Sequence, residues 1–173
     1  MGLNILLTIF SFVLFGTLLV SDNNVIINNV QLVTENQYAI AAFAVAQSVI
    51  DEAGTKAFDE HTVGGIEVPD SSSMSDVLGP ESDELPPSTD VSGATGYWST
   101  VHFDDIDDYN GYRRTVPVAA RLEGDTVSVG VQYVSVADPE SPLTHTSYCK
   151  KMTVTVGSPY LSRSYKFSHL FSY

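Results

Sequence analysis

The chain opens with residues 1–21, MGLNILLTIFSFVLFGTLLVS, which contain no charged side chain. A helix of about 20 apolar residues rises roughly 30 Å, the thickness of the hydrocarbon core of a bilayer. Outside lipid, so large an apolar surface has to be covered by protein. The segment therefore predicts either a membrane span or a helix that buries itself against copies of itself.

A helical pattern continues beyond this segment. The cluster of poor helix formers at residues 21–24 favours either a helix end or a weak point in a continuous helix, and we favour the continuous helix because the pattern resumes at once. The apolar run at residues 39–46 should be enclosed by protein on most sides, and Gly54 with the polar residues beyond it ends the pattern near Phe58. We predict one helix over residues 1 to about 57, roughly 85 Å long, whose first 20 or so residues protrude. The stripe expected on its later part is Ile26, Val30, Val33, Gln37, Ile40 and Ala44.

The second half of the chain alternates apolar and polar residues, as β-strands do. Strands are expected at residues 97–103, 114–122, 126–136, 148–156 and 160–173, with a tight hairpin turn at 123–125 and Pro117 at an edge or a bulge. The side chains expected on buried faces are Val116, Val118, Ala120, Leu122, Val127, Val129, Val131, Tyr133, Met152, Val154, Val156, Leu161, Tyr165 and Phe167.

These patterns predict an α+β fold in which the long N-terminal helix packs on a four- to five-stranded antiparallel sheet. We divide the chain into an apolar transmembrane or filament-core helix (1–24), an amphipathic helix packed on the sheet (25–58), an acidic Pro/Ser/Gly-rich loop region (59–96) and the sheet domain (97–173). The loop region has the composition of a disordered segment, so we expect a surface excursion that packs on a neighbour or a mobile decoration.

The net charge of −13 is unevenly distributed. Residues 1–112 carry −16 and residues 113–173 carry +3. An acidic body of this kind argues against contact with nucleic acid, which needs clustered Lys and Arg. Opposite signs on one chain suit head-to-tail association of copies, although scattered bases on a solvated surface account for the pattern equally well.

The segment FDDIDDYNG at residues 103–111 places four carboxylates within five residues. One interpretation is a calcium site, because Ca²⁺ binds carboxylate, amide and backbone oxygens. The other, which we favour, is a turn in which Asp side chains cap backbone N–H groups, Asn110 and Gly111 make the bend, and Arg113 and Arg114 neutralise charge. The candidate calcium ligands are Asp104, Asp105, Asp107, Asp108 and Asn110.

No catalytic motif is evident. The four histidines (His61, His102, His145 and His169) have no metal-ligand spacing, and neither a nucleophile elbow nor a phosphate-binding glycine loop occurs. Cys149 is the only cysteine, so no intrachain disulfide forms, and a lone thiol in a strand is usually buried and inert. We predict no enzymatic activity and no cofactor other than the calcium of the first interpretation.

An uncharged N-terminal segment that runs into one long helix covered by an antiparallel sheet resembles the type IV pilins and the pseudopilins of type II secretion. Residues 103–111 are also similar to a segment of minor-pilin-like proteins of the mannose-sensitive haemagglutinin type. The chain departs from these families in four respects. Ile5 stands where a Glu is usual, the leader and the helix proline are absent, and there is no cysteine pair. Lys56 is the first basic residue, which argues against a secretory signal peptide; a basic leader ahead of Met1 would account for the missing charge.

The resemblance implies a structural subunit of a type IV pilus-like filament on the bacterial surface, held in the inner membrane before assembly. Its partners would be identical subunits, the membrane, and the pilus or secretion machinery. The alternatives are a membrane-anchored pseudopilin or minor pilin of such a machine, and an anchored calcium-dependent binding module. The residues expected to mediate polymerisation are Ile5, Ile9, Phe10, Phe12, Phe15 and Leu19.

Overall fold

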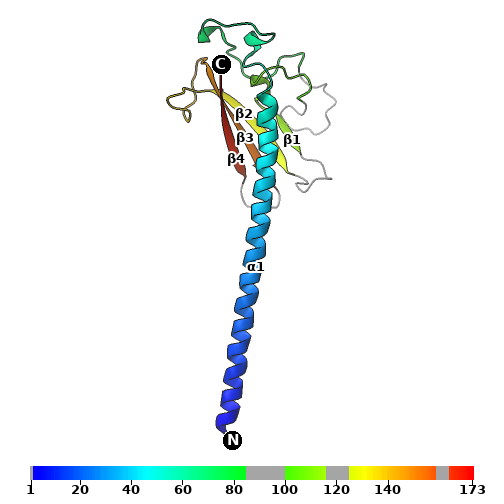
Figure 1. Ribbon diagram of the computed structural model, residues 1–173, viewed down its shortest axis with the longest axis vertical. Helices are drawn as coiled ribbons and strands as arrows, with labels where there is room; N and C mark the ends of the chain where they lie inside the picture. Colours follow the sequence, from blue (N-terminus) through cyan, green and yellow to red (C-terminus); the bar gives the residue numbers. More distant parts are fainter. Residues whose placement is uncertain (1, 85–99, 116–124, 159–163) are drawn as a thin grey trace. The chain divides into compact units, whose positions relative to one another are not determined.

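The computed structural model describes residues 2–84, 100–115, 125–158 and 164–173. Its longest element is α1 (Gly2–Ala53), an uninterrupted α-helix of 52 residues (Figure 1). The helix passes through residues 21–24 without a break, as predicted, but it ends at Ala53, earlier than the predicted 57. The early end has a tertiary cause: the chain leaves the helix to pair Ala57 with Asp105 in an isolated parallel bridge.

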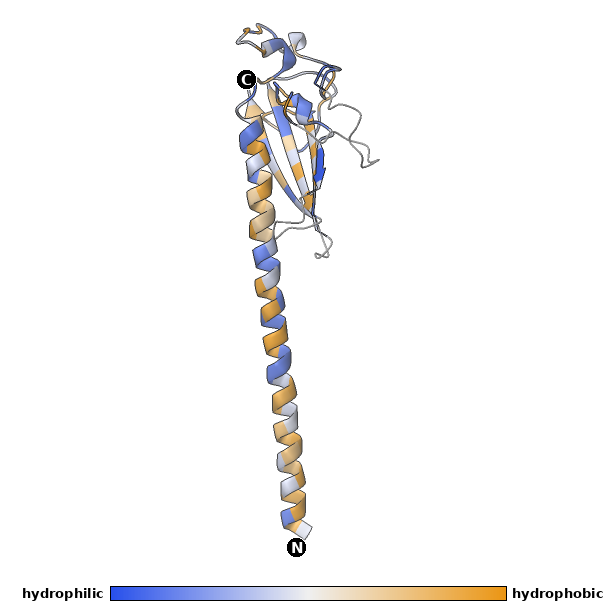
Figure 2. Ribbon diagram, turned by 90° about the vertical axis from the view of Figure 1, so that its right-hand side faces the viewer, coloured by the Kyte–Doolittle hydropathy of each residue, from blue (hydrophilic) through white to orange (hydrophobic). Residues whose placement is uncertain are grey.

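The contacts within the chain divide it into two units, Met1–Ala39 and Ile40–Tyr173. In the first unit, every residue from Gly2 to Gln37 is exposed. The ribbon of α1 is almost uniformly hydrophobic over its first third and mixed after that (Figure 2). Burial begins only in the second unit.

The sheet of the second unit has four strands: β1 (Arg113–Thr115), β2 (Thr126–Tyr133), β3 (Cys149–Gly157) and β4 (Tyr165–Ser172). They lie in the order β1-β2-β3-β4, and each neighbouring pair is antiparallel. The architecture is therefore α+β with a four-stranded antiparallel sheet, as the sequence predicted.

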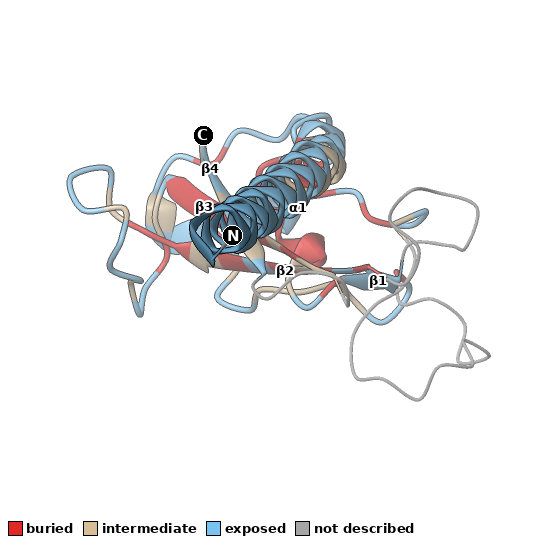
Figure 3. Ribbon diagram, turned by 90° about the horizontal axis from the view of Figure 1, so that it is seen from below, coloured by how far each residue is buried: buried red, intermediate tan, exposed pale blue. Residues whose placement is uncertain are grey.

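One face of the sheet is buried together with the C-terminal part of α1 (Figure 3). The predicted faces of β2 and β3 are confirmed, since their alternating positions are at most 5% exposed, whereas Tyr165 and Phe167 of β4 are only half-buried. Phe43 of α1 meets Phe167 of β4 edge to face, with ring centroids 5.6 Å apart. The buried residues of α1 are Ala42, Ala46, Val49, Ile50 and Ala53.

The predicted helix stripe is wrong. Its six positions are all exposed, including Ile40 at 70%. The buried stripe lies on a different face and is rich in alanine, whose small side chain lets a helix backbone approach a sheet closely. Residues 26–33 are equally apolar, but nothing in the described chain covers them.

One strand prediction also needs correction. Residues 100–103 do not form a strand, because Phe103 folds back in a turn (its N–H donates to the Thr100 carbonyl at 3.3 Å) and its ring packs against Tyr109 at 5.1 Å. The β1–β2 register pairs Thr115 with Thr126, and the predicted hairpin turn at 123–125 lies outside the described residues except for Asp125. Residues 97–99, 116–122 (with Pro117) and Leu161 lie outside the described residues.

The described part of the acidic loop region, residues 59–84, packs on its own domain. It contains two short 3₁₀ helices, η1 (Glu60–Thr62) and η2 (Ser71–Ser73), and a third, η3 (Asp107–Tyr109), lies in the Asp-rich segment. Val68 and Met74 are buried within the domain. This part of the loop region therefore has a fixed place that its composition did not predict.

Candidate functional site

A buried lysine organises the core of the second unit. Lys150 of β3 is 0% exposed, and its ammonium donates hydrogen bonds to Phe58 O at 2.8 Å, Asp59 Oδ2 at 2.9 Å and Asp107 Oδ1. The same ammonium lies 4.8 Å from the ring centroid of Phe58 and 5.1 Å from that of Tyr133. Burying a charge is tolerated only when it is paired and hydrogen-bonded, and here both conditions are met.

Asp59 is the most heavily hydrogen-bonded member of this network. Its carboxylate accepts hydrogen bonds from Tyr133 Oη at 2.7 Å, from Ser75 N at 2.9 Å and from His61 N at 3.2 Å, in addition to Lys150. Burial alone would raise the pKa of Asp59, but these donors outweigh it and lower the pKa to about 2. The carboxylate is therefore ionised at neutral pH and balances Lys150.

The Asp-rich segment is a self-capped turn. Asp105 Oδ1 accepts from the N–H groups of Asp107 and Asp108 at 2.8 and 3.1 Å, and Asp108 Oδ2 accepts from those of Asp104 and Asp105 at 2.9 and 3.0 Å. This confirms the predicted capping. Burial and the charge of Asp107 raise the pKa of Asp105 to about 10. Asp105 therefore carries a proton at neutral pH.

The bend lies at Asn110 and Gly111 as predicted, but the counter-charge does not come from the predicted arginines. Gly111 has a φ of 87°, the left-handed conformation that favours glycine, and Asn110 ties the bend to β2 by accepting from Val131 N at 3.1 Å. Arg113 and Arg114 are exposed, and the ion pair to an Asp of this segment comes from Lys150, while Lys56 donates to the Phe103 carbonyl.

The five candidate calcium ligands are not brought together as one set. Asp107 is paired with Lys150, Asp105 caps amides, Asn110 bonds to Val131 N and the Leu78 carbonyl, and Asp104 is exposed. Within the described ranges, the group of side chains with metal-ligand geometry is another one that shares only Asp108 with this set, namely Glu81, Glu84 and Asp108.

Sequence reasoning missed the two glutamates because they lie in the acidic loop region. The Glu81 N–H donates to Glu84 Oε2 at 3.1 Å, which folds residues 81–84 into a turn. Burial, with Asp108 and Glu81 beside it, raises the pKa of Glu84 to about 9. The three acidic residues of PESDEL (residues 80–85) could have suggested a turn. No residue near them in the sequence indicated that they approach Asp108.

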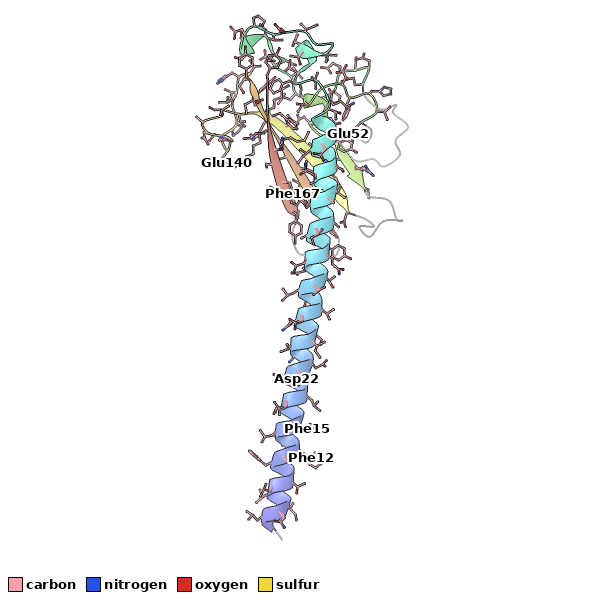
Figure 4. The ribbon with its side chains drawn as sticks, viewed as in Figure 1. Phe12, Phe15, Asp22, Glu52, Glu140 and Phe167 are labelled. Carbon is pink, nitrogen blue, oxygen red and sulfur yellow. The ribbon has the colours of Figure 1, made fainter. Side chains whose placement is uncertain are left out.

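The residues expected to mediate polymerisation are all exposed on α1. Ile5, Ile9, Phe10 and Leu19 are 54–63% exposed, and Phe12 and Phe15 point away from the helix axis into open space (Figure 4). By length and composition α1 could cross a membrane, and a signal sequence would satisfy the same criterion.

The four histidines and Cys149 are the remaining candidates for a chemical role. His61 lies 3.4 Å from Asp59 Oδ1 and is largely exposed, whereas His102, His145 and His169 lie on separate segments. Cys149 is buried, and burial raises the pKa of its thiol, which keeps it in the unreactive protonated form.

Comparison with known proteins gives no match: no family model, no curated protein and no solved structure is significantly similar to this chain. Functional inference therefore depends on the geometry of the exposed helix and of the carboxylate cluster.

The depressed pKa of Asp59 predicts how the second unit responds to acid. Because the folded pKa of about 2 lies below the ordinary 3.8, the network's contribution is complete above about pH 4 and is lost as the pH falls toward 2. The loss should be about 2 kcal/mol. Unfolding free energies of the full chain in mild detergent at pH 5 and pH 2.5 measure it. The Asp59→Asn variant should lose less stability over this interval, and an equal loss in both proteins would contradict the assignment.

Proposed function

We propose that this protein is the structural subunit of an extracellular type IV pilus-like filament that polymerises through its apolar N-terminal helix. The observation that carries the proposal is the uninterrupted exposure of residues 2–37 of α1. Large apolar side chains along this length are 48–74% exposed. A surface of this size is not left in water by a folded protein.

Whatever keeps residues 2–20 of α1 out of water has to surround the helix on all sides. Apolar residues occupy consecutive positions at 5–7, 12–15 and 18–20, and successive residues of a helix point about 100° apart. One partner helix covers one stripe, so it would leave most of this surface exposed. Either lipid or several neighbouring copies must therefore enclose residues 2–20.

The length of the exposed surface favours copies of the chain. A bilayer core accommodates about 20 residues of helix. Beyond Asp22, which Figure 4 marks, α1 continues with exposed apolar residues mixed among Asn and Gln. These apolar residues (Val25, Ile26, Ile27, Val30, Leu32 and Val33) are 54–61% exposed. Lipid that covers residues 2–20 does not reach these residues. In the proposed filament, neighbouring helices staggered along the axis would cover both residues 2–20 and residues 25–33, and they would offer hydrogen-bond partners to the Asn and Gln side chains.

Exposing this segment to water would be costly, so either lipid or copies of the chain must cover it at every stage. Residues 2–20 include thirteen large apolar side chains, each worth about 1.5 kcal/mol or more when buried, so covering them contributes roughly 20 kcal/mol per subunit. In this proposal the segment is stored in the inner membrane and exchanges lipid for other copies during assembly, so that it stays out of water throughout. A repeated heterologous contact of this kind produces a helical polymer.

Electron microscopy of material sheared from the cell surface tests the proposal, with antibodies against the chain as the label. We expect abundant, uniform and labelled fibres. A chain found only in the membrane fraction would contradict the filament and favour an anchored module. A few labelled copies at the tip or base of other fibres would favour a pseudopilin or minor pilin.

A further inference from the structure

Three carboxylates from two separate segments converge near the surface of the second unit. One oxygen from each of Glu81, Glu84 and Asp108 lies within 4.8 Å of the other two. Glu84 is 8% exposed and Asp108 is 1% exposed, so two of the three side chains are withdrawn from water. Carboxylates packed this closely repel one another unless a positive charge joins them.

Two oxygens in this cluster are buried and have no hydrogen-bond partner among the described residues. Asp108 uses Oδ2 to accept from two backbone amides, which leaves Oδ1 as the oxygen it can offer to a ligand. Glu81 Oε2 is the second such oxygen. Buried polar atoms without partners are rare in folded proteins, and a bound ion is one of the partners that such atoms acquire.

The positive charges nearby are already engaged. The Lys150 ammonium is bound by Asp59 and Asp107 on the interior side of the Asp-rich turn. The Lys56 ammonium donates to the Phe103 carbonyl at 2.6 Å. Neither base is paired with Glu81, Glu84 or Asp108, so the described part of the chain does not itself neutralise the cluster.

We propose that Glu81, Glu84 and Asp108 bind a divalent cation, and that the cation is Ca²⁺. The donors are carboxylate oxygens without His or Cys, which suits a hard cation. The three oxygens lie within 4.8 Å of one another, which is close enough for all of them to bind one ion. Ca²⁺ accepts an irregular set of oxygen ligands, whereas Mg²⁺ demands a near-ideal octahedron. Asp104 interacts with Glu84 and is exposed, so it is available to complete the ligand set together with water.

The cation would fasten two parts of the chain. Glu81 and Glu84 lie in the turn that ends the described part of the acidic loop region, and Asp108 lies in η3, next to the residue that binds Lys150. Bound Ca²⁺ would therefore fix the loop region to the turn that contacts the buried network. This inference is independent of filament formation, because all its ligands belong to the second unit.

Calorimetric titration of the chelator-treated full chain in detergent with CaCl₂, and separately with MgCl₂, tests the site. We expect one Ca²⁺ per chain, weaker binding of Mg²⁺, and a rise in the thermal unfolding midpoint on addition of Ca²⁺. Glu84→Gln should weaken Ca²⁺ binding at least about tenfold, because it removes one of the three carboxylate ligands. Asp83→Asn is the matched control, since Asp83 is the exposed neighbour on the same turn, and it should bind like the wild type.

Two results would overturn the proposal. One is the absence of both binding heat and midpoint shift in the wild-type chain, which would mean that the carboxylates are held together by shared protons. The other is Ca²⁺ binding by Glu84→Gln within about twofold of the wild type. If circular dichroism shows that Glu84→Gln is misfolded, Glu81→Gln takes its place with the same expected loss, because Glu81 is less buried and its replacement disturbs less packing.

Discussion

We expect replacement of Phe12 with Asp to abolish the proposed filaments while the second unit remains folded. Phe12 is 73% exposed in the single chain, so its replacement removes no contact within the molecule. In a filament the same position is enclosed by apolar side chains of other copies, and an unpaired carboxylate there costs several kcal/mol in every subunit. Phe15→Asp should behave in the same way.

Fibres counted by electron microscopy, together with circular dichroism of the purified chain, measure this effect. Phe12→Leu is the control, because it keeps an apolar side chain of similar size and should assemble. The isolated domain of residues 26–173 should also fold without residues 1–25. Normal filaments from Phe12→Asp would count decisively against the proposed role of α1.

The second large effect is expected in the core. Lys150→Met should lower the free energy of unfolding by about 3–5 kcal/mol, because it leaves the Asp59 and Asp107 carboxylates buried without their counter-charge. Methionine has nearly the length of lysine, so lost packing contributes little. Lys166→Met, on the exposed face of β4, should change stability by no more than about 0.5 kcal/mol.

Denaturant unfolding of the full chain in detergent measures both variants. The triple variant Lys150→Met, Asp59→Asn, Asp107→Asn removes the unbalanced carboxylates as well, so it should recover part of the lost stability. Equal, small effects of Lys150→Met and Lys166→Met would show that the buried network contributes little.

The strands of the sheet could be predicted because the alternation of apolar and polar residues that specifies each strand lies within the strand itself. In TVSVGVQY the apolar residues alternate, and the same alternation in MTVTV determines which side of β3 is buried. The β1–β2 register, which pairs Thr115 with Thr126, could not be read from the local turn signal at 123–125, because a register depends on how two strands pair.

The buried network was not predictable. Lys150 and Lys151 are adjacent lysines and both are buried, yet Lys150 pairs with buried carboxylates whereas Lys151 pairs with the exposed Glu140 at 2.8 Å. The partners that distinguish Lys150 lie 91 and 43 residues away along the chain. The carboxylate cluster joins Glu84 to Asp108 in the same non-local way.

The prediction of the buried face of α1 failed for a different reason. Periodicity predicted that residues 26–57 are covered, and it chose the wrong face because Ile26 and Val30 are as apolar as Val49 and Ile50. Sequence alone does not distinguish a surface that packs on the chain's own sheet from one that packs on another chain. The exposure of residues 26–33 shows that the described part of the chain does not cover them, and in the filament proposal other copies do.

The most direct test of the filament core identifies what touches Phe12 in native material. A photoactivatable phenylalanine analogue placed at position 12 and irradiated in sheared surface material cross-links to its nearest neighbour. We expect a ladder of covalent dimers, trimers and larger oligomers of this chain. Adducts to lipid alone, with every chain remaining monomeric, would show that the helix is not enclosed by its own copies.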